Sequence, residues 1–422
     1  MTTQPPVPPT AASTATDDRG RIVRVVVTPV AFHAAPRYIG AGIHEPFALR
    51  SVVEVVTASG PTGLGESDGD EEHLRRLERV AGALVGLDVR DPDAVRAAVV
   101  RTADDRPVLA PFEVACLDAE ARLAGVPVHA LLGGQVRDRV PWSTPLFYTR
   151  AGHPGAPDDE VEALDPPGLV RQADRLARRS GLGAITLHGG VLPPATEVAA
   201  MRTLRHQFPG VALGLVAHGA WTVETSRWVA HELAGVVDQL DDPTPGVEGL
   251  GAVAQEAATL DPPLGVSASV RTPDELASAL AVDALREVRV DPHAWGGLRA
   301  VQDVAARCAD AGRTLSLEAP DHLGVSFAAL THLAAATPLL ARGCDTPWSW
   351  RSPDEDVVRP GAPGLVDGAA GVPTAPGLGV ELDRAALARL HRQYRDCGLR
   401  TRDDAGYLRR LRPDADERVP RW

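Results

Sequence analysis

The chain has 422 residues and a formal net charge of −13. This length exceeds that of one ordinary compact domain and suits a (β/α)8-type barrel with a smaller accessory domain. Because the acidic chain has no basic run, and no apolar run of the ~18 residues that cross a bilayer, we expect neither nucleic acid nor a membrane as a partner.

Residues 1–19 are rich in Pro, Thr and Ala and lack the hydrophobic centre of a secretory signal. We therefore expect a disordered tail there. The four cysteines are widely scattered and form no C-x-x-C pair, which is typical of proteins in a reducing compartment. Together these features predict a cytoplasmic protein.

Residues 20–135 are predicted to form a small α+β domain. Two strand patterns come first, at Ile22–Ala31 and Phe47–Thr57. Helical patterns follow at Glu71–Leu87, Asp93–Ala103 and Ala110–Ala124. The final segment, 351–422, is rich in Pro and Gly and then becomes helical, and we expect it to return to this first domain.

Residues 136–350 differ in character, because short apolar runs alternate with amphipathic helical patterns. This alternation indicates repeated βα units around a parallel sheet. Eight apolar runs end near Phe147, His188, His218, Asp241, Ser267, Asp291, Glu318 and Cys344. The carboxyl ends of barrel strands form the mouth at which functional side chains converge. We therefore expect the functional site at these residues.

Several motifs follow one another in order along the chain. They are Gly63–Glu66, Phe112–Asp118, Val126–Gly134, Gly189–Pro194, Gly219–Glu224, Asp242–Gly246, Trp295–Arg299, His322–Ser326 and Pro376–Glu381. As an ordered set they resemble the glucarate dehydratases and related acid-sugar dehydratases of the enolase superfamily, from about residue 21 to the last residue. The resemblance implies an α/β fold, a modified (β/α)7β barrel of the TIM type. An α+β capping domain, built from the N-terminal segment and the C-terminal tail, would close over its mouth.

In the family that the chain resembles, a proton is removed next to a carboxylate and a bound Mg²⁺ stabilises the resulting negative charge. The resemblance places the metal ligands, usually Asp, Glu and Asn, at Val216, Asp241 and Ser267. Among these only Asp241 has a carboxylate. One carboxylate and one hydroxyl supply far fewer oxygen ligands than the roughly six that Mg²⁺ prefers. We therefore predict that the chain binds no Mg²⁺, and we expect no other cofactor.

The proton-transfer residues of that family are altered as well. The sequence contains no lysine, and the family's Lys-x-Lys pair corresponds to Thr186 and His188. On the opposite face Asp291 is retained, whereas the histidine position corresponds to Glu318. Two facing carboxylates repel, which raises the pKa of one of them. We predict His188, Asp291 and Glu318 as catalytic residues.

The predicted substrate-binding residues are His44, Tyr148, Thr186, His218 and His322, of which His44 resembles a capping-loop residue that touches a substrate carboxylate. The mouth has lost two lysines and a divalent metal relative to the family. We therefore predict a small polar ligand other than a dianionic sugar acid such as glucarate. The alternative is an acid held by protonated His44, His188 and His218, because nearby carboxylates raise histidine pKa values.

Three functional hypotheses follow. The first is a metal-independent lyase or isomerase, in which His188 faces the Asp291 and Glu318 pair. The second is a catalytically inactive scaffold or binding protein, which the replacement of lysine by threonine and of aspartate by valine also predicts. The third is a metalloenzyme that binds Zn²⁺, Fe²⁺ or Mn²⁺ through His188, His218 and Asp241. The resemblance further implies a homo-oligomer.

Overall fold

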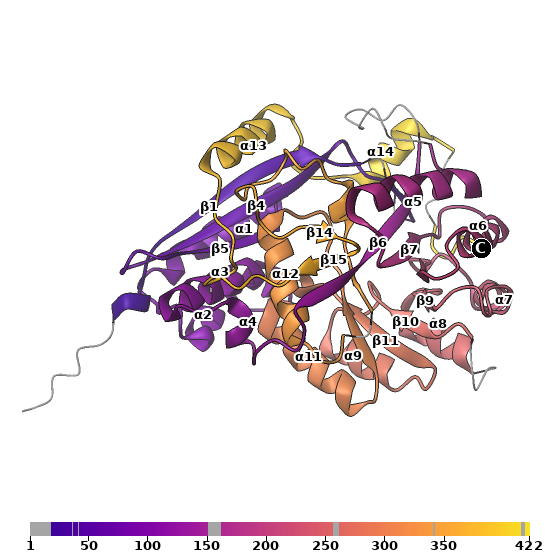
Figure 1. The fold of residues 1–422 in the computed structure, drawn as a ribbon, viewed down its shortest axis with the longest axis horizontal. Coiled ribbons are helices and arrows are strands. Elements are labelled where there is room, and N and C mark those ends of the chain that lie inside the picture. The colour runs from indigo at the N-terminus through magenta and orange to yellow at the C-terminus, as the bar shows by residue number, and fades with distance from the viewer. Residues whose placement is uncertain are drawn as a thin grey trace, which may run out of the picture.

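The computed structural model describes residues 18–35, 37–40, 42–150, 162–255, 261–340, 342–414 and 418–422. The predicted tail, 1–19, lies outside the described residues except for its last two, which begin the 3-10 helix η1 (Asp18–Gly20). Figure 1 shows a region of long strands and helices beside a barrel. Within the described ranges, no helix is long and apolar enough to cross a membrane.

The capping region is built on an antiparallel sheet with the strand order β1-β4-β5. Its strands are β1 (Ile22–His33), β4 (Phe47–Thr57) and β5 (Thr62–Asp68), and its helices are α1 (Glu71–Ala81), η2 (Gly82–Leu84), α2 (Pro92–Val99), η3 (Ala103–Asp105), α3 (Arg106–Ala124) and α4 (Val128–Leu131). A short hairpin of β2 (Arg37–Ile39) and β3 (Gly42–Ile43) lies apart from this sheet. Strand β2 pairs with barrel strand β6, so the hairpin lies at the edge of the barrel mouth.

Parallel strands form the barrel. They are β6 (Arg139–Thr149), β7 (Ala184–His188), β8 (Ala212–Val216), β9 (Gln239–Asp241), β10 (Leu264–Val266), β11 (Leu285–Val290), β12 (Thr314–Leu317) and β13 (Cys344–Asp345). The intervening helices are α5 (Pro166–Ser180), α6 (Pro194–Gln207), α7 (Val223–Glu232), α8 (Gly246–Ala254), α9 (Pro273–Leu280), α10 (Pro292–Trp295), α11 (Leu298–Asp310) and α12 (Gly324–Ala336). Strand β13 pairs with β6, and a bridge between Glu318 and Asp345 joins it to the end of β12, which closes the ring. The predicted α/β fold, a (β/α)7β barrel with a capping domain, is confirmed.

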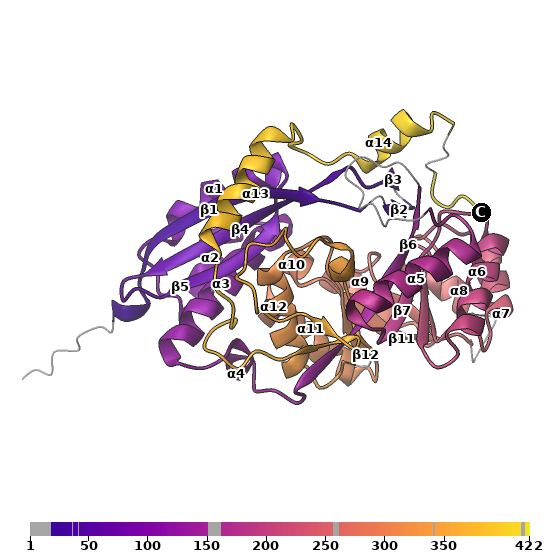
Figure 2. The same ribbon diagram turned by 45° about the horizontal axis from the view of Figure 1, so that its top comes forward.

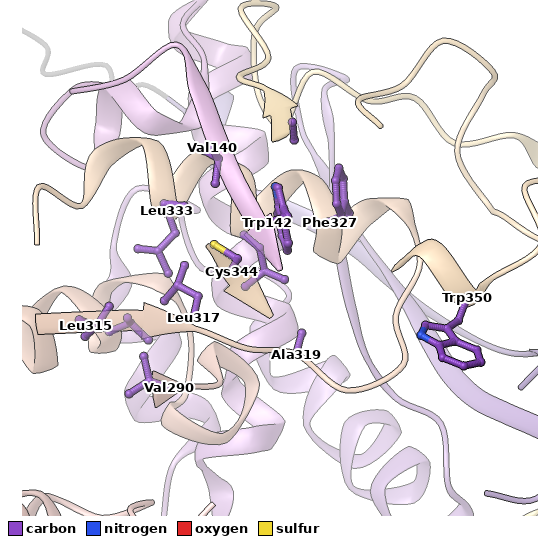
Figure 3. Packing of buried hydrophobic residues seen from close by; sticks show 14 of the residues in the cluster. Val140, Trp142, Val290, Leu315, Leu317, Ala319, Phe327, Leu333, Cys344 and Trp350 are labelled. Carbon is purple, nitrogen blue, oxygen red and sulfur yellow. The ribbon is translucent and has the colours of Figure 1, made fainter. Parts of the chain in front are cut away.

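Helix α12 is buried along its whole length. A helix that is apolar on all sides needs cover on all sides, and α12 contacts β6, β5 of the capping sheet, α4 and α11. Figure 3 shows its Phe327 beside Trp142 of β6, with ring centroids 4.7 Å apart. Leu317 and Cys344 lie next to them in the same core. The barrel and the adjoining face of the capping sheet therefore share one hydrophobic cluster, and the rest of the capping region has a separate one.

The C-terminal segment contacts both regions. Its elements are η4 (Pro347–Trp350), β14 (Leu365–Val366), β15 (Ala369–Gly371), α13 (Arg384–Asp396) and α14 (Asp404–Leu411). Strand β15 pairs with β6 of the barrel, whereas α13 lies along β1 of the capping sheet, as Figure 2 shows. Near the chain end, the carbonyl of Trp422 accepts a 2.5 Å hydrogen bond from the backbone N–H of Thr222 in the barrel. The segment thus ties the capping sheet to two sides of the barrel.

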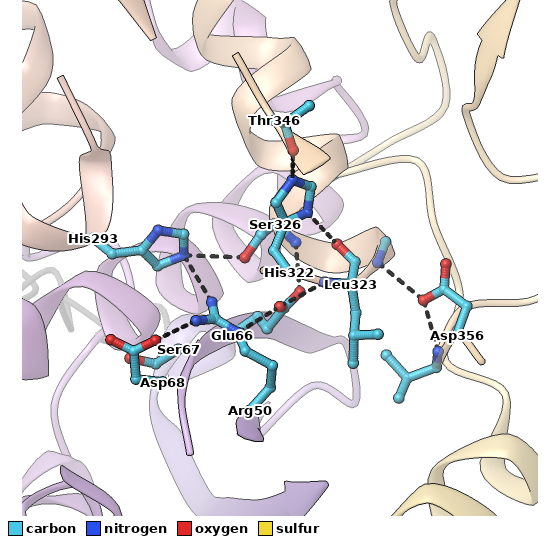
Figure 4. A network of polar contacts seen from close by, with 12 residues as sticks. Arg50, Glu66, Ser67, Asp68, His293, His322, Leu323, Ser326, Thr346 and Asp356 are labelled. Atoms are coloured by element: carbon cyan, nitrogen blue, oxygen red, sulfur yellow. Dashed lines mark hydrogen bonds and ion pairs between the residues drawn. The ribbon is translucent and has the colours of Figure 1, made fainter. Parts of the chain in front are cut away.

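A buried ionic network joins the capping sheet to the barrel (Figure 4). The Glu66 carboxylate accepts hydrogen bonds from the backbone N–H groups of Leu323 (2.8 Å) and Ser326 (2.9 Å), at the start of α12. It also accepts one from Arg50 Nε at 3.0 Å. Burial raises the pKa of Glu66, but the charge of Arg50 and these hydrogen bonds outweigh burial and lower it. The ionised Glu66 therefore fixes the capping sheet over one side of the barrel mouth.

Candidate functional site at the barrel mouth

A cavity of about 470 Å³ lies where the strand ends face the β2–β3 hairpin. Side chains from the barrel, the capping region and the C-terminal segment all contribute to its lining. The charged and imidazole groups among them are Arg37, His44, Asp68, His188, His218, Arg271, Arg289, Asp291, His293, Glu318, Asp321, Asp345 and Arg402. The cavity has the size and the mixed lining of a small-molecule site.

Arg289 is the charged centre of this mouth. It lies near the end of β11 and is only 5% exposed. Its Nη1 donates to Asp345 Oδ2 at 2.6 Å, and its Nη2 lies 2.9 Å from Asp241 Oδ2. Burial lowers the pKa of the guanidinium, but the charges of Asp241 and Asp345 more than offset burial and raise it. Arg289 is therefore a fixed positive charge between two strand-end carboxylates.

His188 and His218 form a pair on the other side of Asp345. His188 Nδ1 lies 3.1 Å from His218 Nε2, so one of these nitrogens donates to the other. His188 Nε2 lies 3.4 Å from Asp345 Oδ2. Burial raises the pKa of Asp345, but Arg289 and His188 lower it to about 2. Asp345 is therefore ionised at neutral pH and connects His188 with Arg289.

Glu318 follows β12 and faces the same cavity. Its two carboxylate oxygens lie 2.7 and 2.8 Å from the hydroxyl of Ser267, which donates to them. Burial raises the pKa of Glu318 to about 7, although Arg289 and Ser267 oppose the increase. Asp291 adds to the increase, in the direction that the sequence predicts, but burial is the larger cause. At neutral pH Glu318 therefore exchanges between its acid and carboxylate forms.

Asp291 is bonded to a histidine instead of facing Glu318 alone. Its Oδ1 accepts from the backbone N–H of His293 and from His293 Nδ1, both at 2.9 Å. His293 Nε2 lies 3.0 Å from Ser326 Oγ and 3.4 Å from Arg50 Nη2. Because Arg50 can only donate, Nε2 acts as the acceptor and the proton belongs on Nδ1. The result is an Asp–His pair at the end of β11.

The capping side of the cavity contains a second charged cluster. The carboxylate of Asp321 is bonded to Arg37 and lies 3.3 Å from Arg402 Nη1. His44 Nδ1 lies 3.6 Å from Asp321 Oδ2, and His44 Nε2 lies 3.8 Å from Asp404 Oδ2. The hairpin, the end of the barrel and the C-terminal segment meet at these groups.

The structure brings five of the predicted residues to the cavity, namely His44, His188, His218, Asp291 and Glu318. The other three are buried. Tyr148 lies on β6, where its backbone pairs with that of Tyr38, and its hydroxyl has no hydrogen-bond partner among the described residues. Thr186 donates to Ser143 Oγ at 3.2 Å, and His322 is bonded to Thr346. In the described structure these contacts place Tyr148, Thr186 and His322 behind the lining.

The expectation that nearby carboxylates keep His44 and His218 protonated is wrong. Burial lowers the pKa of His218 to about 3, and His188 and Arg289 act in the same direction. Burial also lowers the pKa of His44 to about 3, with Arg37 and Arg402 contributing. Burial, aided by the neighbouring positive groups, therefore outweighs the carboxylates, and both imidazoles are neutral at pH 7.

The residues at the positions implied for Mg²⁺ ligands do not suit that ion. The side chain of Val216 has no donor atom, and the Ser267 hydroxyl is engaged with Glu318. Asp241 Oδ1 accepts from Gln239 at 2.5 Å and its Oδ2 faces Arg289. A positive guanidinium at this distance competes directly with a divalent cation for the carboxylate. Mg²⁺ needs about six oxygen ligands in near-octahedral geometry.

The grouping required for the alternative metal site is also not found. His188 and His218 face each other, whereas Asp241 faces Arg289. Over the residues that the structure describes, no group of three or more His, Cys, Asp or Glu side chains is arranged to hold a metal ion. Asp241 is therefore a partner of an arginine and not a third member of a histidine cluster.

Three important groups were not identified from the sequence: Arg289, Asp345 and His293. Side chains alternate along a strand, so Arg289, two residues before Asp291, points to the same face. Asp345 directly follows the last apolar residue of the final strand, where the strand-end rule would have placed it in the mouth. His293 comes two residues after Asp291, and only the structure shows the hydrogen bond between them. All three residues lie within two positions of a residue that the sequence analysis identified.

Comparisons with known proteins agree with this architecture. A family model described as "Enolase C-terminal domain-like" matches residues 168–386. The protein named "Probable glucarate dehydratase" from Streptomyces coelicolor is 41% identical over 431 residues, which cover 95% of this chain and 99% of that protein.

Solved structures are similar over nearly the whole chain. An enolase from Gibberella zeae PH-1, complexed with magnesium, formate and sulfate, is 47% identical, with a TM-score of 0.91 and coverage of 96% of this chain and 98% of its own. An enolase from Mycobacterium smegmatis, complexed with tartrate, is 46% identical, with a TM-score of 0.90 and coverage of 95% and 98%. The chain belongs to the enolase superfamily and is similar to glucarate dehydratases.

Proposed function

We propose that the chain is a metal-independent lyase or isomerase that moves a proton on a small polar substrate other than glucarate. One observation carries the proposal: two proton-transfer groups, His188 and Glu318, line the same cavity. His188 comes from β7 and Glu318 follows β12, and strands β13 and β6 lie between these two in the ring. The fixed cation Arg289 is bonded to Asp345, which contacts His188, and its charge acts on Glu318. This arrangement supplies a base, an acid and a positive charge.

The chemistry proceeds in two proton transfers. The Glu318 carboxylate takes a proton from a carbon next to a carbonyl or carboxylate of the substrate and becomes the neutral acid. The electron pair of the broken C–H bond moves onto the substrate oxygen, whose charge the N–H groups of Arg289 stabilise. His188 then acts as the acid and gives a proton either to carbon, which isomerises the substrate, or to a leaving hydroxyl, which departs as water. Each step conserves charge and protons.

Asp291 has a positioning role in this proposal. It holds the Nδ1 proton of His293, so that His293 Nε2 stays an acceptor. Its negative charge also disfavours ionisation of Glu318. Removing Asp291 would alter both neighbours without removing a group that touches the substrate.

The charge of the lining favours a small polar molecule over a dianion. The lining contains Arg37, Arg271, Arg289 and Arg402 against Asp68, Asp291, Glu318, Asp321 and Asp345. Three of the arginines already have carboxylate partners. Little positive charge is therefore left to attract a substrate with two carboxylates. The similarity to a "Probable glucarate dehydratase" supports the reaction class, proton removal with elimination, more than the substrate.

Deuterium exchange tests the proposal. The protein is incubated in D₂O with a panel of small hydroxy acids and polyols, glucarate included, in the presence of EDTA, and mass gain is followed by mass spectrometry. We expect exchange into at least one compound but not into glucarate, and loss of at least ~100-fold in His188→Gln and Glu318→Gln. His231→Gln, at an exposed histidine of α7, is the control and should behave as the wild type.

Exchange that requires added Mg²⁺ would contradict metal independence. If no compound exchanges, but one binds with equal affinity to the wild type and to both variants, the scaffold hypothesis replaces the enzymatic one.

A further inference from the structure

Three of the carboxylates at the barrel mouth, Asp241, Glu318 and Asp345, face one positive group of the chain itself, Arg289. Asp241 at the end of β9 and Asp345 at the end of β13 each contact a different nitrogen of Arg289. Glu318, at the end of β12, is electrostatically coupled to the same group. Glu318 and Asp345 lie side by side at the ends of β12 and β13, whereas Asp241 comes from β9 on the other side of β11, which carries Arg289. One side chain therefore neutralises charges from several strand ends.

Arg289 is held too firmly to move aside. Its side chain is 6% exposed, and the side chains of Asp241 and Asp345 are 0% and 4% exposed. Breaking a buried pair by removing one partner leaves an uncompensated charge and strongly destabilises the fold. The planar guanidinium also holds the two carboxylates apart at the width of its own fork. A small cation would require them to approach each other.

We propose that the guanidinium of Arg289 takes the place of a divalent cation at the barrel mouth and thereby excludes such ions from it. This role rests on the metal independence of the proposed function and makes Arg289 the residue responsible for that independence. A salt bridge with a structural role alone would not have the following consequence. Without the guanidinium, Asp241, Asp345 and Glu318 become a cluster of uncompensated oxygen donors, which hard divalent cations bind. Removal of Arg289 should therefore create a cation site.

The test is direct binding of Mn²⁺, measured by electron paramagnetic resonance and by calorimetry. We expect no stoichiometric binding to the wild type, and binding at least ~10-fold tighter in Arg289→Ala. Arg289→Lys keeps the positive charge and should bind no better than the wild type. Arg271→Ala is the matched control, because Arg271 also lines the cavity but is exposed and bonds a backbone carbonyl, that of Ala268.

Stoichiometric Mn²⁺ binding to the wild type, equal to that of Arg289→Ala, would overturn the proposal. So would a folded Arg289→Ala variant that fails to bind. If Arg289→Ala does not fold without metal, we expect Mn²⁺ to restore the melting transition, and failure to restore it is equally decisive. Because the readout is binding and not turnover, the inference can hold even if the exchange experiment fails.

Discussion

Glu318 combines a functional position with a thermodynamic cost. Its carboxylate is buried at the mouth, and burial raises its pKa to about 7. An acid whose folded pKa lies above its unfolded value stabilises the fold only while it is protonated. That stabilisation is complete below about pH 4.5 and is lost as the pH rises through about 7. Glu318 therefore weakens the folded state under the conditions in which it could act as a base.

The variant Glu318→Gln should be more stable than the wild type at pH 8. Glutamine is neutral at every pH, so it avoids the cost of the buried charge. From the change in pKa, from 4.5 to about 7, we expect a gain of about 3 kcal/mol in the free energy of unfolding at pH 8, and no gain at pH 4. Urea unfolding at both pH values measures the difference.

The exposed substitution Glu224→Gln is the control, and it should show no pH-dependent difference from the wild type. Equal effects of Glu318→Gln at pH 4 and pH 8 would show that Glu318 is not the buried acid described above.

At the scale of single residues, the sequence identified some of the cavity-lining groups but not others. His188, Asp291 and Glu318 were found because strand ends of a parallel barrel converge, whatever the details of packing. Arg289 was not found, because a charged side chain inside a barrel is unusual and its two partners come from distant strands. Its role depends on contacts that no local pattern in the sequence encodes.

At the scale of elements, α3 and β5 show how closely two backbones can approach. A Cβ at Gly65 would lie 1.9 Å from the carbonyl oxygen of Pro111, and one at Gly63 would lie 1.8 Å from that of Ala115. Only glycine permits this approach. The close packing of β5 also places Glu66, the next residue along, in contact with the start of α12.

Gly65→Ala should destabilise the protein by at least about 2 kcal/mol, because either the strand or the helix must shift. Gly82→Ala is the matched control. A Cβ there has nothing within 4 Å, and the backbone is helical with φ −66°. Alanine at position 82 should be neutral or stabilise by up to about 1 kcal/mol. Thermal unfolding of both variants measures the contrast, and equal melting temperatures would contradict the close-packing argument.

The predicted elements were mostly present, but their ends moved. The helix predicted at Ala110–Ala124 begins earlier, at Arg106, because a proline in the first turn of a helix is tolerated. The helix predicted at Glu71–Leu87 ends at Ala81 and continues as the short η2. The final strand, predicted to end at Cys344, extends to Asp345. Local patterns identify an element well, but its ends depend on neighbouring contacts.

At the scale of the whole molecule, Glu66 connects two regions that are far apart in the sequence. It lies in a motif shared with the family, yet its partners Leu323 and Ser326 belong to the barrel. The fold was predictable because the motifs resemble a known family. The junction was not, because burial and pairing of Arg50 and Glu66 depend on how the capping sheet meets α12.

Glu66→Gln should cost about 2 to 3 kcal/mol, since it removes one of the two carboxylates bonded to the buried Arg50 and leaves Asp68 as its remaining charge partner. Glu72→Gln is the control: its carboxylate is 61% exposed and pairs with Arg75 at the surface, a contact worth less than about 1 kcal/mol. Urea unfolding followed by tryptophan fluorescence measures both variants.

The sign of the pH dependence provides a second check on Glu66. The pKa of Glu66 is lowered in the folded state, so its stabilisation is present above the unfolded pKa of about 4.5 and is lost as the pH falls. The wild type should therefore lose more stability than Glu66→Gln between pH 6 and pH 3. A parallel decline of the two proteins would contradict the ionised network.

Metal analysis, joined to a dehydration assay on glucarate, tests the central claim of a metal-independent site most directly. Protein purified without added metal is analysed by mass spectrometry for bound metal, and dehydration of glucarate is then measured with and without Mg²⁺. We predict no stoichiometric metal and no dehydration in either condition. Stoichiometric Mg²⁺ that supports dehydration of glucarate would contradict the roles assigned to Arg289, Asp241 and Glu318.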